Sequence, residues 1–161
     1  MFSFLKIIIN KIIDFLYLPF KKLIPFEIFR YGCVGGGNMI LDTLLYYIFY
    51  HYVFDEQIFD LGFIAFTPLI ASYVFVFPIT FITGFLLNKY IAFPNSYLKN
   101  KSQFFRYILT VTGSIILHYF ILKFFGQVLE FWPLISKILT VCIVTVYSFC
   151  VQKFFSFKTK K

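Results

Sequence analysis

The sequence predicts an all-α membrane protein: four transmembrane helices, arranged as two helical hairpins that repeat in parallel, preceded by an amphipathic interfacial helix. Composition is the first observation behind this fold class, because the 161-residue chain is 60% hydrophobic and 14% charged, whereas soluble domains carry about 25% charged residues. The second is a mean hydropathy of +0.84, with four apolar runs of about 20 residues, the length that crosses a bilayer as a helix. The third is an internal repeat.

The amino-terminal segment, residues 1–25, is predicted to lie along the cytoplasmic membrane surface as a helix. Its polar residues recur at steps of three or four and so share one helix face: Ser3, Lys6, Asn10 and Asp14. A signal peptide has an unbroken apolar centre and a small-residue cleavage site, and this segment has neither. We expect Pro19 and Pro25 to end the helix. Its role is open between a simple anchor and a docking surface for a partner.

The remaining chain is predicted to form one transmembrane domain, residues 26–158, followed by a basic cytoplasmic tail, residues 159–161. In lipid every backbone group must be paired internally, so its apolar runs are expected to be helices. The runs lack the alternating polarity of barrel strands. The four predicted spans cover about residues 31–50, 66–87, 107–125 and 132–151.

Charge predicts the orientation of these spans. All basic residues except Lys123 and Lys137 lie before the first span, between the second and third, or after the fourth. The other two loops hold acidic residues instead: Asp55, Glu56, Asp60 and Glu130. By the positive-inside rule, both termini and the middle loop are cytoplasmic. This distribution also argues against reading the net charge of +8 as a nucleic-acid-binding surface.

The two halves of the domain repeat. A Phe-Arg-Tyr triplet opens the first span at Arg30 and the third at Arg106, and Asp42 and His118 follow these arginines at equal distance. Both halves end with an amide, a lysine and an aromatic exit, in 86-LLNKYIAF-93 and 150-CVQKFFSF-157. Each half is therefore predicted to be one hairpin that starts in the cytoplasm, and a pseudo-two-fold axis along the membrane normal is expected.

Polar residues inside the spans are candidates for function. At about 1.5 Å per residue, Asp42 and His118 lie roughly 18 Å above their arginines, so the two could meet at mid-depth. Asn38 lies one turn below Asp42 on the same face. Because intramembrane charges are costly and normally turned inward, two interpretations stay open: hydrogen bonds that fix packing, or a polar path whose protonation is tied to transport. Lys123 is expected to snorkel, whereas the deeper Lys137 is predicted to face inward as an anion site or a counter-charge to Asp42.

Cations and glycines mark the cytoplasmic helix ends. The repeat-related cations form a predicted ring able to hold a phosphate, beside Asn88, although the positive-inside rule alone would also explain them: Arg30, Lys89, Arg106 and Lys153. The glycines of the first span are predicted to let another helix approach closely, with a hinge as the alternative: Gly32, Gly35, Gly36 and Gly37.

Motifs of enzymes are missing from the sequence. There is no nucleotide-binding loop, zinc-protease motif or nucleophile elbow. His51 and His118 stand at different predicted depths, and the three cysteines lie in predicted spans without metal-type spacing. We therefore expect no catalytic residue, no metal and no cofactor, and hence no enzyme.

The motifs together resemble the GtrA-like family of small polytopic membrane proteins, over about residues 26 to 158. The residues that carry the resemblance are 28-IFRYGCVGGGNMILD-42, 85-FLLNKYIAF-93, 136-SKILTV-141 and 149-FCVQKFFSF-157. Lys89 stands where that family usually has Arg, and Gln152 replaces a second Asn. The resemblance implies a protein of the bacterial inner membrane that flips a polyprenyl-phosphate-linked sugar, or the carrier itself, in cell-surface polysaccharide synthesis beside a membrane glycosyltransferase.

The sequence thus favours a small flippase, expected to be a homo-oligomer surrounded by membrane lipids. In this hypothesis the ring of four cations captures the phosphate, Lys137 draws the headgroup outward, and polar residues line the path between them: Asn38, Asp42, Asn88 and His118. One alternative is a non-transporting scaffold or regulatory partner of a glycosyltransferase. A second is a proton-coupled exporter of cationic compounds, since four-helix exporters also use a single acid in the first span.

Overall fold

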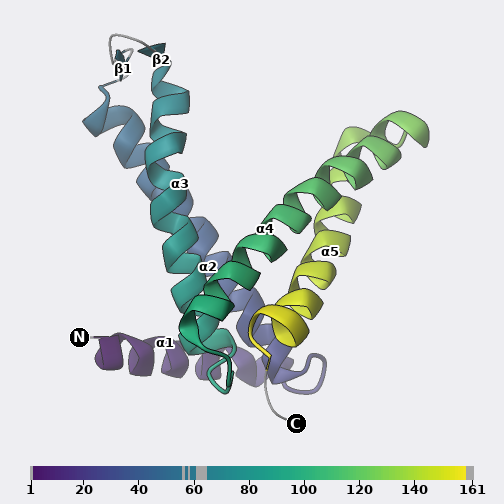
Figure 1. The fold of residues 1–161 in the computed structure, drawn as a ribbon. Coiled ribbons are helices and arrows are strands. Elements are labelled where there is room, and N and C mark those ends of the chain that lie inside the picture. The colour runs from purple at the N-terminus through teal and green to yellow at the C-terminus, as the bar shows by residue number, and fades with distance from the viewer. Residues whose placement is uncertain (1, 56, 58, 61–64, 159–161) are drawn as a thin grey trace. The chain divides into compact units, whose positions relative to one another are not determined.

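The structure, a computed structural model, describes residues 2–55, 57, 59–60 and 65–158. Its contacts divide the chain into two units, Met1–Ala92 and Phe93–Lys161. Each unit contains one hairpin of long helices (Figure 1), and each is described by itself. The predicted basic tail, residues 159–161, lies outside the described residues.

The first unit is built from a surface helix and a hairpin. Its helices are α1 (Phe2–Tyr17), α2 (Phe26–Ile48) and α3 (Pro68–Leu87), with a short 3-10 turn, η1 (Leu18–Phe20), after α1. At the far end of the hairpin, β1 (Phe59–Asp60) and β2 (Ala65–Phe66) form a two-residue antiparallel pair. α3 begins where the sequence dictates, because Pro68 suits the first helical position and the Thr67 hydroxyl accepts a hydrogen bond from the Ile70 N–H at 3.4 Å.

Small and β-branched residues form the buried stripe of α3. They recur every four residues, so they lie on one helix face, and α2 packs lengthwise against α3 in this hairpin. The stripe consists of Ser72, Val76, Thr80 and Gly84, each less than 9% exposed. In a membrane environment small residues let two helices approach closely, because association there depends on van der Waals packing and interhelical hydrogen bonds.

The second unit is a hairpin of α4 (Asn100–Lys123) and α5 (Pro133–Val151). An aromatic cluster closes one end: the rings of Phe93 and Phe157 stack with centroids 5.5 Å apart, and Tyr107 lies 6.0 Å from Phe157. All three residues are buried. Further along the helices, Gly113 of α4 leaves room for Tyr147 of α5, because a Cβ added to this glycine would lie 2.6 Å from the tyrosine hydroxyl oxygen.

A π-helical turn of five residues follows each long helix of the described hairpins. These turns are η2 (Phe49–Val53), η3 (Asn88–Ala92), η4 (Phe124–Val128) and η5 (Gln152–Ser156). After η2 and η4 the chain reverses through an acidic residue in the left-handed region, Asp55 at φ 47° and Glu130 at φ 52°. The two hairpins therefore share the order long helix, π turn, long helix, π turn, and the first adds the β1–β2 pair between its helices.

Three helices of the described chain are long and apolar enough to cross a membrane. They cover Pro68–Ala92, Asn100–Val128 and Leu134–Ser156 with their π turns. α2 is long enough, about 35 Å at 1.5 Å per residue, but its glycines, Asn38 and Asp42 lower its hydropathy, and it is not among the three. The predicted four-span arrangement is thus supported for three of its helices. α2 and α4 also begin before the predicted spans 31–50 and 107–125, since both helices continue through their charged ends.

α1 lies across the end of the α2–α3 hairpin (Figure 1), and the side that it turns toward the hairpin is mixed in polarity, since Lys11 and Asp14 remain exposed. Lys6 and Asn10 are half-buried and Ile13 is 3% exposed. Its apolar residues face outward, with Phe4 68% and Phe15 73% exposed. The predicted amphipathic surface helix thus leaves most of its large apolar side chains exposed, where lipid would cover them.

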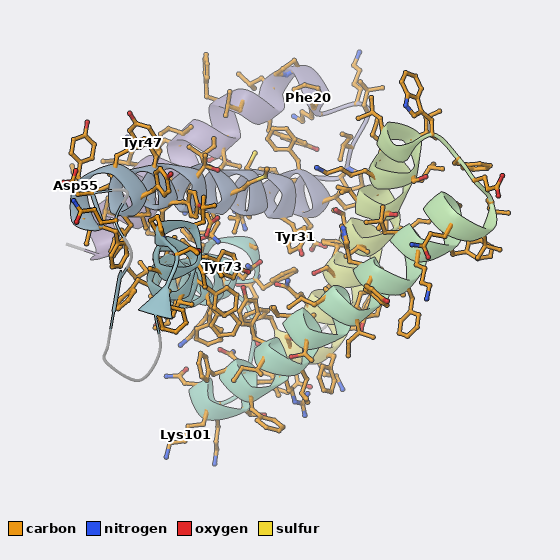
Figure 2. All side chains as sticks on the ribbon, turned by 90° about the horizontal axis from the view of Figure 1, so that it is seen from above. Phe20, Tyr31, Tyr47, Asp55, Tyr73 and Lys101 are labelled. Atoms are coloured by element: carbon orange, nitrogen blue, oxygen red, sulfur yellow. The ribbon has the colours of Figure 1, made fainter. Side chains whose placement is uncertain are left out.

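The hairpins present aromatic side chains to their surroundings (Figure 2). Tyr47 of α2 points away from α3 and is 54% exposed, and Tyr73 of α3 is 58% exposed. On a soluble protein such a surface would be exceptional. It is typical of helices whose outer faces contact lipid.

Candidate functional site

Two polar pairs join α2 to α3 in the middle of the first hairpin. The Asn38 side chain donates from Nδ2 to the Thr80 carbonyl at 3.1 Å and accepts at Oδ1 from the Thr83 hydroxyl at 2.9 Å. One turn further along α2, Asp42 accepts at Oδ1 from the Thr80 hydroxyl at 2.8 Å. Both Asn38 amide atoms are engaged, so this side chain fixes the packing of the two helices. We call these four residues the mid-hairpin network.

The Thr80 hydroxyl is the adjustable member of the mid-hairpin network. It carries one proton, and besides Asp42 the carbonyl oxygens of Val76 and Phe77 lie within reach, at 3.2 and 3.3 Å. When Asp42 is ionised, Thr80 donates to it. A protonated Asp42 would instead donate to the Thr80 oxygen, and Thr80 would donate to a carbonyl of its own helix. The site can therefore hydrogen-bond the carboxyl group in either protonation state.

His118, the repeat counterpart of Asp42, lies in the second unit. It is half-buried on α4, and no side-chain hydrogen bond is found for it within the described residues. The predicted meeting of Asp42 with His118, and that of Asp42 with Lys137, involve both units and stay predictions. Thr110 and Ser114, which precede His118 on the same helix face, hydrogen-bond to carbonyls one turn back on α4 at 2.9 and 3.0 Å.

The two predicted phosphate-binding cations of the first unit rest on aromatic rings. The Arg30 guanidinium carbon lies 4.6 Å from the centroid of Phe26, and its buried Nε has no hydrogen-bond partner within the described residues. The Lys89 ammonium lies 4.6 Å from the centroid of Tyr90 and 6.0 Å from that of Phe85. Cation–π contacts of this kind hold a charged group in place through the face of the ring.

The second unit repeats this arrangement with an additional link. Lys153 lies 5.7 Å from the centroids of both Phe149 and Phe154, one turn back and one residue on, as Lys89 does. Arg106 lies 4.9 Å from the centroid of Phe155 and donates from Nη1 to the carbonyl of the same residue at 3.0 Å. It therefore ties α4 to η5.

Hydroxyl groups reinforce this end of the second hairpin. The hydroxyls of Thr110 and Ser156 share a hydrogen bond of 2.7 Å, and the Ser156 hydroxyl also lies 3.2 Å from the Arg106 carbonyl. Both side chains are fully enclosed, at 2% and 0% exposure. The result is a fixed frame around Arg106.

An amide lies one residue before each lysine. Asn88 is 6% exposed and donates to the Gly84 carbonyl at 2.8 Å, while its buried Oδ1 accepts nothing within the described residues. Gln152 is 4% exposed and donates to the Ser148 hydroxyl at 3.3 Å. Both amides bond one turn back along their own helices, so the replacement of Asn by Gln keeps the local arrangement.

The opposite end of the second hairpin contains the other two basic residues. Lys123 and Lys137 line one pocket of about 420 Å³, together with Tyr119, Gln127 and Ser136. The prediction separated a snorkelling Lys123 from an inward-facing Lys137. In the structure both lysines line the same pocket, because the last turn of α4 and the first turns of α5 lie side by side, and their predicted roles stay predictions. Both lysines are exposed, so the pocket is open to a charged ligand.

The sequence was compared with models of known protein families. The profile described as the GtrA/DPMS transmembrane domain matches residues 30–157. The chain belongs to this family. No curated protein matches it in the same comparison, and no solved structure does. As a GtrA/DPMS transmembrane domain with long apolar helices, the protein is an integral membrane protein.

The glycine cluster of this GtrA/DPMS domain lies on an open face of α2. A Cβ added to any of its four members meets no heavy atom of the first unit within 4 Å: Gly32, Gly35, Gly36 and Gly37. The close approach of α2 and α3 therefore depends on the small stripe of α3, and any helix that the glycines accommodate comes from outside this unit. Their predicted packing role stays a prediction.

Several residues of the GtrA/DPMS domain emerge only from the structure. Thr80 and Thr83 partner Asp42 and Asn38, and Ser156 partners Thr110. A sequence signal existed for the threonines, because they are hydroxyl groups one turn apart within an uncharged span. No group of three or more metal-ligating side chains occurs among the described residues.

Proposed function

We propose that this GtrA/DPMS domain translocates a polyprenyl-phosphate-linked sugar, or the polyprenyl phosphate itself, across the bacterial inner membrane in cell-surface polysaccharide synthesis. In this proposal α2 is the fourth span, both termini are cytoplasmic, and no covalent chemistry takes place. The substrate is an anion with a long apolar tail. It needs cations at both membrane surfaces, polar groups between them and a side open to lipid.

The observation that carries the proposal is the position of cations at both ends of one hairpin. In the second unit, Arg106 and Lys153 rest on aromatic rings at one end, and Lys123 and Lys137 share a pocket at the other. Arg106 and Lys123 are separated along α4 by roughly 25 Å at 1.5 Å per residue, close to the 30 Å or so of the hydrocarbon core. A phosphate released from one cation pair would thus meet the other at the opposite surface.

The first hairpin would supply the polar part of the route. Its mid-hairpin network offers a carboxyl and a hydroxyl group at a depth where lipid offers none. Arg30 and Lys89 would capture the phosphate on the cytoplasmic side, with Asn88 beside them. His118 would line the route from the second hairpin. Because each hairpin alone is too thin to enclose a sugar, we propose that the protein acts as a homo-oligomer.

A flipping assay tests this proposal. The purified protein is reconstituted in vesicles with a fluorescent polyprenyl-phosphate sugar, and the fraction that a membrane-impermeant quencher reaches is followed with time. We expect Lys137→Ala to slow flipping about tenfold or more, the factor for a lost hydrogen bond to a charged group. Lys101→Ala, which removes an exposed lysine at the start of α4, is the matched control.

The mid-hairpin network is tested in the same assay. Asp42→Ala and Thr80→Val are compared with Thr43→Val, whose hydroxyl bonds only within α2, to the Met39 carbonyl at 3.0 Å. Unchanged flipping in folded Asp42→Ala and Lys137→Ala variants would overturn the residue assignment.

Two other functions are separated by related measurements. A scaffold or regulatory partner of a membrane glycosyltransferase would lose association with that enzyme when residues 1–18 are removed, and its vesicles would show no flipping even when intact. The exposed aromatic faces favour this candidate as a binding surface. A proton-coupled exporter would accumulate lipophilic cations in vesicles with an imposed pH gradient. The paired lysines at the outer end disfavour it, since they repel a cation.

A further inference from the structure

A pocket of about 230 Å³ lies between α1 and the end of the α2–α3 hairpin. α1 covers it with Leu5, Lys6 and Ile9, while α3 and η3 contribute Leu86 and Tyr90 to its walls. The walls are aliphatic apart from three groups: the Lys6 side chain, the Tyr90 ring and the hydroxyl of Thr83, which donates to Asn38. The pocket lies entirely within the first unit, and the second hairpin has no helix equivalent to α1.

α1 is fixed over this pocket from its carboxyl end. The Tyr17 hydroxyl donates to the Ile24 carbonyl at 2.8 Å, and its ring lies 4.9 Å from Phe26 and 5.3 Å from Phe29, centroid to centroid. The amino-terminal half of α1, which carries Leu5, Lys6 and Ile9, has no comparable anchor among the described contacts. It covers the pocket as a flap held at one end.

Size and charge indicate what this pocket takes. Ligand pockets for whole molecules usually have about 300–1,000 Å³, so this smaller, aliphatic space suits one segment of a hydrocarbon chain. Two cations adjoin it: Lys6 in its wall and Lys89, whose ammonium lies 4.6 Å from the Tyr90 ring. A chain that ends in a negative charge fits this combination, because the Lys6 ammonium in the wall attracts an anion and gains nothing from an uncharged lipid.

We infer that the pocket beneath α1 binds the first segment of the hydrocarbon chain of a polyprenyl phosphate, with Lys6 on the phosphate. This inference rests on the proposed function and names the place where the carrier waits before its headgroup crosses the membrane. The chain enters from the lipid side, and the pocket adjoins the mid-hairpin network through Thr83. The site holds the hydrocarbon chain beside the phosphate and contacts the phosphate through Lys6, whereas the cation pairs act on the headgroup as it crosses.

Photo-crosslinking tests the inference without measuring transport. The full-length protein in nanodiscs is exposed to polyprenyl phosphate with a diazirine in its first isoprene units, and labelled peptides are mapped by mass spectrometry. We expect labelling in the segments of Ile9 and Leu86. Ile9→Trp, which fills the pocket, should weaken labelling about tenfold. This is the loss expected when about two methylene groups of the lipid chain are no longer buried in the pocket. Ile8→Trp, on the exposed side of the same helix, should leave it unchanged.

A second pair of variants tests the charge, and a second probe tests the source of the chain. Lys6→Glu should reduce labelling at least as much as Ile9→Trp, whereas Lys11→Glu, on the exposed side of α1, should not. The second probe is phosphatidylglycerol with a diazirine. If it labels the pocket as strongly as the polyprenyl probe does, the pocket binds ordinary membrane lipid and the inference is overturned. Unchanged labelling in both Ile9→Trp and Lys6→Glu would also overturn it.

The outcome also separates this inference from the proposed function. Specific labelling without flipping would support a carrier site in a protein that does not transport. Flipping at the normal rate with no labelling of α1 or α3 would support transport and place the carrier elsewhere.

Discussion

The two hairpins share their ends and differ in their middles. Each ends in a π-helical turn that opens with a buried amide and a lysine held on aromatic rings. The first is joined at mid-height by the mid-hairpin network, whereas the second is joined at one end by Arg106, Thr110 and Ser156. The shared parts are those that meet the membrane surface. This pattern would be expected if the ends of both hairpins bind the same part of the substrate at the membrane surface, while their middles have different functions within the membrane.

The largest effect is expected from the lysines of the π turns, and it shows whether the two hairpin ends have the same function. Lys89→Ala and Lys153→Ala should each slow flipping of the polyprenyl-phosphate sugar about tenfold or more, and by similar factors, because the two lysines have matching aromatic contacts. Lys99→Ala is the control, as an exposed lysine outside both π turns. A large effect from one lysine with none from the other would show that the two ends are alike in structure alone.

A smaller effect is expected where the middles differ. Gly113→Ala should lower the free energy of unfolding by about 1–3 kcal/mol, the usual range for overpacking, because its Cβ would lie 2.6 Å from the Tyr147 hydroxyl oxygen. Chemical unfolding in detergent measures this. Tyr147→Phe should rescue it. Gly35→Ala should be neutral or slightly stabilising, since a Cβ there meets nothing in its own unit and Ala is the better helix former. A loss in Gly35→Ala would instead indicate that α2 packs against another helix.

The smallest effect concerns the turns at the far ends of the hairpins. Glu130 and Asp55 both have a left-handed backbone, at φ 52° and φ 47°. Glu130→Gly should stabilise the fold by roughly 0.4–1 kcal/mol, and Asp55→Gly by less, because Asp tolerates this conformation better than Glu. Thermal unfolding of both variants beside the parent protein gives the comparison. Equal gains would show that the two turns are under equal strain.

Local features of the fold could be predicted from the sequence, and contacts distant in sequence could not. Pro68 and Pro133 each begin a helix, where proline suits the first position. The repeat of amide, lysine and aromatic residues predicted matching ends. The cation–π contacts of Lys89 and Lys153 follow from helical spacing, because their ring partners lie one turn back or one residue on. Hydropathy predicted the helices but misjudged their ends, since charged first turns are helical too.

The hydrogen-bond partners of Arg106 and Asp42 could be identified only from the structure. Arg106 was predicted to help hold a phosphate, and this stays a prediction; the structure adds that its Nη1 donates to the carbonyl of Phe155, a residue 49 positions away. Asp42 was matched with His118 and Lys137 by depth, and these matches stay predictions; within its own unit it accepts a hydrogen bond from Thr80 on the neighbouring helix, which the sequence did not indicate. Depth along a helix can be read from spacing. The direction in which a side chain points depends on the rotation of each helix about its own axis. A stripe of small residues, such as that of α3, is only a weak indication of this rotation in the sequence.

The flat position of α1 has a consequence for the shape of the membrane around the protein. A helix of 16 residues is about 24 Å long and roughly 10 Å wide, and its exposed phenylalanines would occupy the space of lipids in one leaflet alone. Nothing comparable lies at the β1–β2 end of this unit among the described residues. The first unit taken by itself is then broader in one leaflet than in the other. We expect it to favour bilayers that curve toward the leaflet in which it is narrower.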